Sequence, residues 1–261
     1  MKKYILTSIL LYLYCISWSA FSAVILQKTR VIIEPDCKEA ELVLDAQKNV
    51  SSLVQSWVTG PDESVASHFT ITPAMSLLKA GQSQSLRLIY QGEGAPKDRE
   101  SLLYVNIQDS VAVSDDMQGK NAINSSFLQV IKGFYRPKSL PLEGAAAAPL
   151  ALKWEVKRQG TNKFMLKLTN PTPYHVVFSG ISLVGGKKKL DEKPHSFVDT
   201  KFDYIKPYSI SEIKLSGVYE INKAEKVVYI IVNDYGMAEA YIAEIKEGKS
   251  TKVKRIIRDK K

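Results

Sequence analysis

The side chains best suited to catalysis or metal binding are few and widely spaced in this sequence. The three histidines are His68, His175 and His195, and none has a second ligand-type residue at the spacing of a metal site. The turn Gly92-Glu93-Gly94 lacks the third glycine of a dinucleotide-binding loop, and neither a nucleophile elbow nor a phosphate-binding loop occurs. We therefore expect no enzyme, no metal and no cofactor, and we interpret each histidine as a surface or packed residue.

The first 22 residues have the pattern of a secretory signal peptide. Lys2 and Lys3 precede an uncharged apolar run over 4–18, and Ala20-Phe21-Ser22 places small residues where a signal peptidase reads them. We expect cleavage between Ser22 and Ala23, followed by export. No later segment is long and apolar enough for a spanning helix, so we expect no stable membrane insertion.

The mature chain would keep one cysteine, Cys37, and could form no internal disulfide. We interpret Cys37 as a small apolar side chain near a strand end, with a reactive thiol as the alternative. The mature chain would carry a net charge of +7, of which +6 lies in 246–261. The remaining body is close to neutral, which argues against a nucleic-acid-binding surface. We expect the basic tail to be a frayed, solvated end, with weak electrostatic contact to a partner as the alternative.

Alternating apolar residues predict strands along most of the mature chain. The runs over 83–90 and 101–107 show a period of two, which is typical of strands. Further runs separated by turn residues favour an all-β sandwich, and similar runs resume after residue 149. Between them, 138–149 is rich in proline and alanine and has no strand alternation. The predicted units are a signal peptide (1–22), a first sandwich (23–137), a linker (138–149), a second sandwich (150–245) and the basic tail (246–261).

Seven short segments follow one another in order between Ala23 and about Ile245. They are Thr29-Arg30-Val31-Ile32, Gln55-Ser56-Trp57-Val58, Ile71-Thr72-Pro73, Lys97-Asp98-Arg99-Glu100-Ser101-Leu102, Lys132-Gly133-Phe134-Tyr135-Arg136-Pro137, Asn170-Pro171-Thr172-Pro173-Tyr174 and Asn233-Asp234-Tyr235-Gly236. In this order, behind a signal peptide, they resemble the periplasmic pilus chaperones of the chaperone–usher pathway, the PapD-like family.

The resemblance implies an all-β fold of two immunoglobulin-like β-sandwich domains arranged in an L. It also implies a function: a periplasmic chaperone that stabilises fimbrial subunits by donor-strand complementation and delivers them to an outer-membrane usher. In this mechanism, an edge strand of the first domain enters the open sandwich of a subunit. Its backbone hydrogen bonds supply affinity and its alternating side chains fill the groove.

The resemblance further implies three groups of functional residues. Arg30 and Lys132 would bind the C-terminal carboxylate of the subunit. The donor strand would include Ile123, Ser125 and Phe127, with Leu128 taking part if a bulge shifts the register; Ser125 departs from the apolar pattern of the family. An interdomain ionic cluster would consist of Glu100, Arg136 and Asp234.

Two alternatives remain open from the residues alone. Phe127 and Leu128 could be the two faces of an internal strand. The whole chain could also be a secreted two-domain immunoglobulin-like adhesin or surface-binding module. The joint presence of Arg30 and Lys132 favours the chaperone, because an adhesin has no use for that pair.

Overall fold

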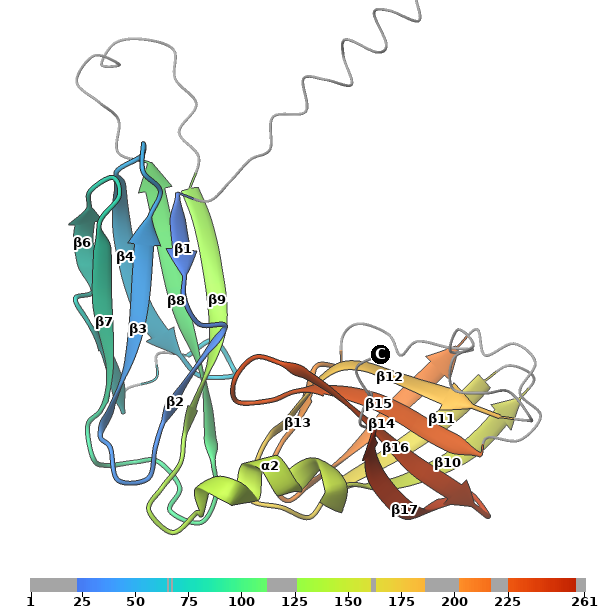
Figure 1. The fold of residues 1–261 in the computed structure, drawn as a ribbon. Coiled ribbons are helices and arrows are strands. Elements are labelled where there is room, and N and C mark those ends of the chain that lie inside the picture. The colour runs from blue at the N-terminus through green and yellow to red at the C-terminus, as the bar shows by residue number, and fades with distance from the viewer. Residues whose placement is uncertain are drawn as a thin grey trace, which may run out of the picture.

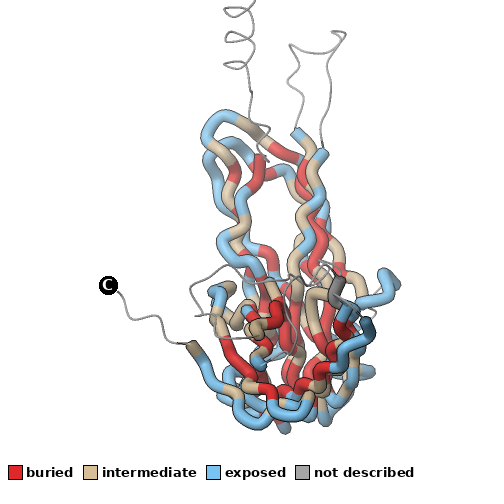
Figure 2. Tube along the Cα trace, turned by 90° about the vertical axis from the view of Figure 1, so that its right-hand side faces the viewer, coloured by how far each residue is buried: buried red, intermediate tan, exposed pale blue. Residues whose placement is uncertain are grey.

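The chain forms two β domains in a computed structural model that describes residues 23–64, 66, 68–111, 126–160, 163–185, 202–216 and 225–256. Within these ranges the regular elements are all strands except for one helix, α2. The end of the first domain meets the side of the second, which gives the molecule the shape of an L (Figure 1). Buried positions recur along the strands of both domains (Figure 2). This is the predicted architecture of two immunoglobulin-like sandwiches.

The first domain consists of two sheets packed face to face. One sheet has the strand order β1-β3-β7-β5, and the other has the order β2-β9-β8-β4-β6. The strand bounds are β1 (Val24–Leu26), β2 (Arg30–Ile33), β3 (Glu39–Ala46), β4 (Ser52–Thr59), β5 (Phe69–Thr72), β6 (Met75–Leu78), β7 (Ser83–Tyr90), β8 (Ser101–Val111) and β9 (Ser126–Tyr135).

Alternation along the central strands explains the core of the first domain. Leu86 and Leu88 of β7 are almost fully buried, and so are Leu103, Val105 and Ile107 of β8. The intervening residues of β7 face outward, as the period of two predicts. The expectation for the two clearest strands is therefore confirmed. Cys37 differs from its expectation, because it is exposed in the turn after β2 rather than packed.

The second domain wraps one eight-stranded sheet around a core rich in aromatic residues. Its order is β13-β12-β15-β16-β17-β10-β11-β14, and the β17–β10 pairing joins its two halves. Trp154 on one half and Tyr229 on the other pack with ring centroids 5.1 Å apart. The strand bounds are β10 (Lys153–Gly160), β11 (Lys163–Asn170), β12 (Val176–Val184), β13 (Tyr204–Ile205), β14 (Ser209–Ser216), β15 (Lys226–Val232), β16 (Ala238–Lys246) and β17 (Lys249–Ile256).

The predicted linker contains regular structure. Helix α2 spans Leu142–Ala151, and its residue Ala148 is buried against the core of the second domain. The alanine run explains the helix, because alanine has the highest helix propensity. Pro149 lies within this helix, and its carbonyl accepts a hydrogen bond of 2.7 Å from the hydroxyl of Tyr229. The second domain thus holds most of the segment that joins it to the first.

The expectation of a frayed basic tail is wrong for the part of the tail that the structure describes. Strand β17 pairs with β16 from Lys249 to Ile256, and Val253 packs on the core. The Ser250 hydroxyl accepts a hydrogen bond of 3.0 Å from the backbone N–H of Trp154. The density of basic charge does not prevent strand formation here, because the backbone of β17 pairs with β16 while its basic side chains stay in water.

Deleting residues 249–261 is expected to lower the melting temperature by at least several degrees. The deletion removes the β16–β17 pairing and the contact of Val253 with the core. Thermal unfolding followed by circular dichroism measures the change. The matched control deletes only 257–261 and leaves β17 intact. An unchanged transition in the longer deletion would show that β17 contributes nothing to stability.

Candidate functional site

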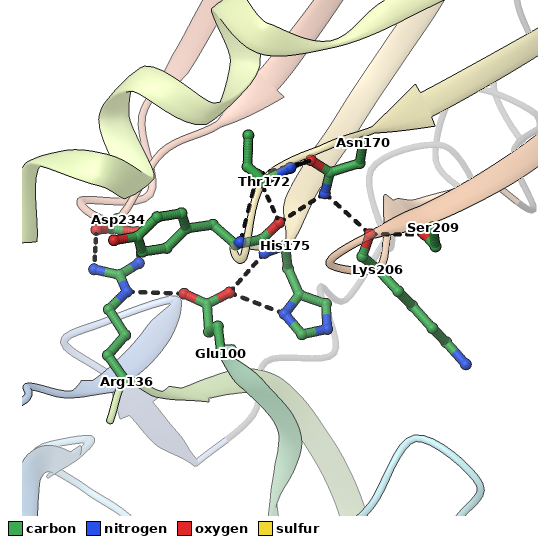
Figure 3. A network of polar contacts seen from close by, with 9 residues as sticks. Glu100, Arg136, Asn170, Thr172, His175, Lys206, Ser209 and Asp234 are labelled. Carbon is green, nitrogen blue, oxygen red and sulfur yellow. Dashed lines mark hydrogen bonds and ion pairs between the residues drawn. The ribbon is translucent and has the colours of Figure 1, made fainter. Parts of the chain in front are cut away.

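Arg136 ties the two domains together through two carboxylates. Its Nε donates to Glu100 at 2.8 Å, and its Nη1 and Nη2 donate to the two oxygens of Asp234 at 2.7 and 2.9 Å. Glu100 and Arg136 belong to the first domain and Asp234 to the second (Figure 3). The side chains of Arg136 and Glu100 are 4% and 1% exposed. The structure therefore brings together all three residues of the expected ionic cluster, and the planar fork of arginine holds both partners.

The turn between β15 and β16 positions Asp234. The side-chain oxygen of Asn233 accepts hydrogen bonds from the backbone N–H groups of Tyr235 and Met237, at 3.0 and 2.9 Å. Gly236 has a φ of 77°, and a Cβ on it would lie 2.4 Å from the hydroxyl oxygen of Thr29. Both the left-handed conformation and the close approach of the first domain require glycine at this position.

His175 is a member of this cluster that the sequence reasoning missed. Its backbone N–H donates to Glu100 at 2.9 Å, and its ring Nδ1 lies 2.9 Å from the same carboxylate oxygen (Figure 3). The preceding loop is fixed by buried Asn170, whose side chain donates to the carbonyl of Tyr174 at 2.7 Å and accepts from the N–H of Thr172 at 3.0 Å. In the sequence, the feature that could have pointed to a role for His175 is its position directly after the Asn170–Tyr174 segment.

Burial alone would lower the pKa of Arg136. The hydrogen bonds to Asp234 and the charges of Glu100 and Asp234 outweigh that effect and raise the pKa above its ordinary value. The guanidinium is therefore held in its charged form. It acts as a permanent cation between the domains.

A cleft of about 900 Å³ lies between the domains, and Arg30 lines it. Arg30 is 8% exposed, and its Nη1 donates to the backbone carbonyl of Val232 in the second domain at 2.8 Å. Its Nε has no hydrogen-bond partner among the described residues. Burial lowers the pKa of Arg30, and the charges of Asp234 and Glu100 oppose this shift. Arg30 thus presents a poorly solvated cation with donor capacity to spare.

Lys132 lies next to Arg30 but is turned to a different partner. The two residues are register partners in the parallel pairing of β2 with β9. The Lys132 ammonium lies 2.8 Å from a carboxylate oxygen of Asp203, which belongs to the second domain. Lys132 is not among the residues that line the cleft, although the resemblance placed both cations there.

Strand β9 has an open edge, which we define as residues 126–131 on the side away from β8. Strand β2 covers that side only from Lys132 to Tyr135, and no described strand is paired with β9 along the open edge. Leu128 is 55% exposed and Val130 is 50% exposed, and both lie on the face that also carries Lys132. The side chain of Gln129 points the other way and donates to the carbonyl of Val24 at 3.0 Å.

The expected donor residues divide into three groups. Ile123 and Ser125 lie outside the described residues. Phe127 is half-buried and shares the inner face of β9 with Ile131, which packs on the core. Leu128 is exposed without a bulge, because β9 pairs with β8 in unbroken register from Ser126 to Tyr135. The register shift on which a role for Leu128 depended does not occur in the described part of β9. Val130, which the sequence patterns did not single out, is exposed on the same face as Leu128.

Comparison with protein families identifies both domains. Residues 23–141 match the model described as "Pili and flagellar-assembly chaperone, PapD N-terminal domain", and residues 147–243 match "Pili assembly chaperone PapD, C-terminal domain". The chain belongs to the PapD family of pilus-assembly chaperones. Members of this family are chaperones and not enzymes. No helix in the described ranges is long and apolar enough to cross a membrane.

Individual chaperones resemble this one over nearly its whole length. The probable fimbrial chaperone YadV of Escherichia coli K12 is 34% identical over 245 residues, covering 89% of this chain and 94% of YadV. The crystal structure of YadV matches with a TM-score of 0.70 at 32% identity, over 86% of this chaperone and all of that chain. The structure of the Salmonella enterica SafA pilin in complex with the SafB chaperone matches with a TM-score of 0.66 at 25% identity, over 88% and 99% of the two chains.

Proposed function

We propose that this chaperone stabilises a fimbrial subunit by adding β9 to the subunit's incomplete sandwich. The observation that carries the proposal is the open edge of β9, with exposed Leu128 and Val130, leading directly to Lys132 and Arg30. An unpaired strand edge is a template for an added strand, and natural proteins usually block or cover such an edge. Here the edge carries exposed apolar side chains and no described strand covers it, as strand donation requires.

The pairing of β2 with β9 sets the direction of an added strand. Strand β2 runs parallel to β9, and β9 runs toward the domain junction. A subunit strand that ends in the cleft must therefore also run parallel to β9. Its last residue would reach Arg30 and Lys132, where two cations can bind the terminal carboxylate.

An anchored carboxylate would also set the register of the complex. Side chains alternate between the two faces of a strand, so a slip by one residue would turn every subunit side chain to the wrong face. Fixing the last residue at the Arg30–Lys132 pair excludes that slip. The anchor would supply register, and the edge of β9 would supply most of the buried area.

Cellular location and delivery complete the proposal. A chaperone that protects subunits before assembly must meet them outside the cytoplasm, and the signal-peptide pattern of 1–22 supports export to the periplasm. The SafB chaperone is bound to a pilin in its structure, which supports fimbrial subunits as the partners of this chain. Delivery to an outer-membrane usher is the step we propose to follow capture.

Replacing Leu128 and Val130 together with serine is expected to weaken subunit capture by about 10–100-fold, because two apolar side chains would lose their burial in the complex. The matched control is Met75→Ser with Leu77→Ser. These side chains are each 58% exposed on β6, the opposite edge of the same sheet. The measurement is the amount of subunit that co-purifies one-to-one with each tagged variant from the periplasm, beside a melting curve.

The control pair should leave capture unchanged, since β6 lies at the far edge of the sheet from β9. Phe127→Ser should also weaken capture, because an added strand contacts its neighbour on both faces of the sheet. Equal capture by the Leu128→Ser/Val130→Ser variant and the native chaperone would remove β9 as the donated strand. Loss of capture in the Met75→Ser/Leu77→Ser variant alone would place the subunit at the other edge.

A further inference from the structure

Lys132 is already bound to a carboxylate in the free chaperone. Its ammonium lies 2.8 Å from Asp203 and 5.9 Å from the centre of the Tyr104 ring. Its register partner Arg30 lines the cleft, whereas Lys132 does not. Only one of the two cations of the proposed anchor, Arg30, therefore lines the cleft, because Lys132 is paired with a carboxylate of the second domain.

The fold fixes the backbone of Asp203 beside Lys132. It directly precedes β13, and its backbone carbonyl accepts the N–H of Phe178 at 2.7 Å. The backbone is therefore fixed, while the carboxylate remains 47% exposed. A half-exposed carboxylate can be displaced from an ammonium at small cost, because water replaces the lost contact.

We propose that Asp203 is a specificity-determining residue for subunit capture, an inference that rests on the proposed function above. Asp203 would occupy Lys132 in the free chaperone, and the C-terminal carboxylate of the subunit would compete for the same ammonium. The competing groups are chemically equivalent. Only a strand that ends in a free carboxylate at this point can replace the ion pair that Lys132 loses when it leaves Asp203.

The competition has two physical consequences. It lowers affinity for every carboxylate ligand by the strength of the Lys132–Asp203 pair. It also leaves a like charge near the bound terminus, because Asp203 stays within reach after Lys132 has turned. Both effects weaken the hold on the subunit. A weaker hold favours later release, which a chaperone that passes its subunit on requires.

The test compares Asp203→Asn with the native chaperone against two synthetic peptides. Both peptides copy the C-terminal strand of the subunit that co-purifies with the chaperone; one ends in a carboxylate and the other in an amide. For the acid peptide, Asp203→Asn is expected to lower the Kd by about twofold to fivefold, which is the upper part of the range of a partly exposed ion pair. For the amide peptide the Kd should not change.

The matched control is Asp45→Asn, which removes the same charge from β3, in the sheet that does not contain β9. It should alter neither Kd. Weaker binding of the acid peptide by Asp203→Asn would overturn the inference, since Asp203 would then support Lys132 in its binding position. An equal change for both peptides would also overturn it. Retention of the full acid preference by Lys132→Ala would instead refute the anchor of the proposed function.

Discussion

Replacing Arg136 with alanine is expected to lower the free energy of unfolding by about 3–5 kcal/mol. Glu100 is fully buried and would lose its arginine, and Asp234 would lose both of its guanidinium contacts. The two carboxylates would then face each other across the domain junction. Chemical denaturation measures the loss. We expect the two domains to unfold together in the native chaperone and in separate transitions in Arg136→Ala, because the cluster links them.

Two further variants distinguish the effect of the positive charge of Arg136 from the effect of its hydrogen-bonding geometry. Arg136→Lys keeps a cation but loses the fork, so it should be less stable than the native chaperone and more stable than Arg136→Ala. Glu100→Gln combined with Arg136→Ala should recover part of the loss, because the buried carboxylate that lacks its arginine is gone. If Arg136→Ala changed the free energy of unfolding by less than about 0.5 kcal/mol, the cluster would contribute no more than an ordinary surface ion pair.

Replacing Arg30 or Lys132 with alanine is expected to abolish subunit capture while the chaperone stays folded. The reason is that a C-terminal carboxylate would lose one of its two cations and the register that they set. The measurement is a periplasmic pull-down of the subunit with each variant, beside a melting curve.

The structure changes one detail of this expectation. Arg30 donates to the carbonyl of Val232, so Arg30→Ala should also lower the free energy of unfolding by about 1 kcal/mol, since a partly buried hydrogen bond is lost. Lys132→Ala removes only the partly exposed pair with Asp203 and should cost less. Lys138→Ala is the control, because Lys138 is a solvent-exposed cation with a loose contact of 3.6 Å to Asp36. Undiminished capture by the Arg30→Ala/Lys132→Ala double variant would contradict the anchor.

Much of the ionic site could be predicted through the family resemblance that short segments of sequence carry. The Lys132–Pro137 and Asn233–Gly236 segments contain Arg136 and Asp234, and in the structure Arg136 contacts both Glu100 and Asp234. The partners Asp203 and His175 could not be predicted. Asp203 meets Lys132 and His175 meets Glu100 only because the second domain packs against the first.

The all-β class and the two sandwiches could be predicted from the sequence, because a period of two is a local property that burial on one face imposes on a strand. Which strand edges stay open and which charges meet depends on how the strands and the two domains pack. The basic run after Lys246 became strand β17, since an adjacent strand offered unpaired backbone groups. Lys132 became a paired cation, since the second domain placed a carboxylate beside it. Pairing partners and ion pairs depend on residues distant in the chain, and only folding brings those residues together.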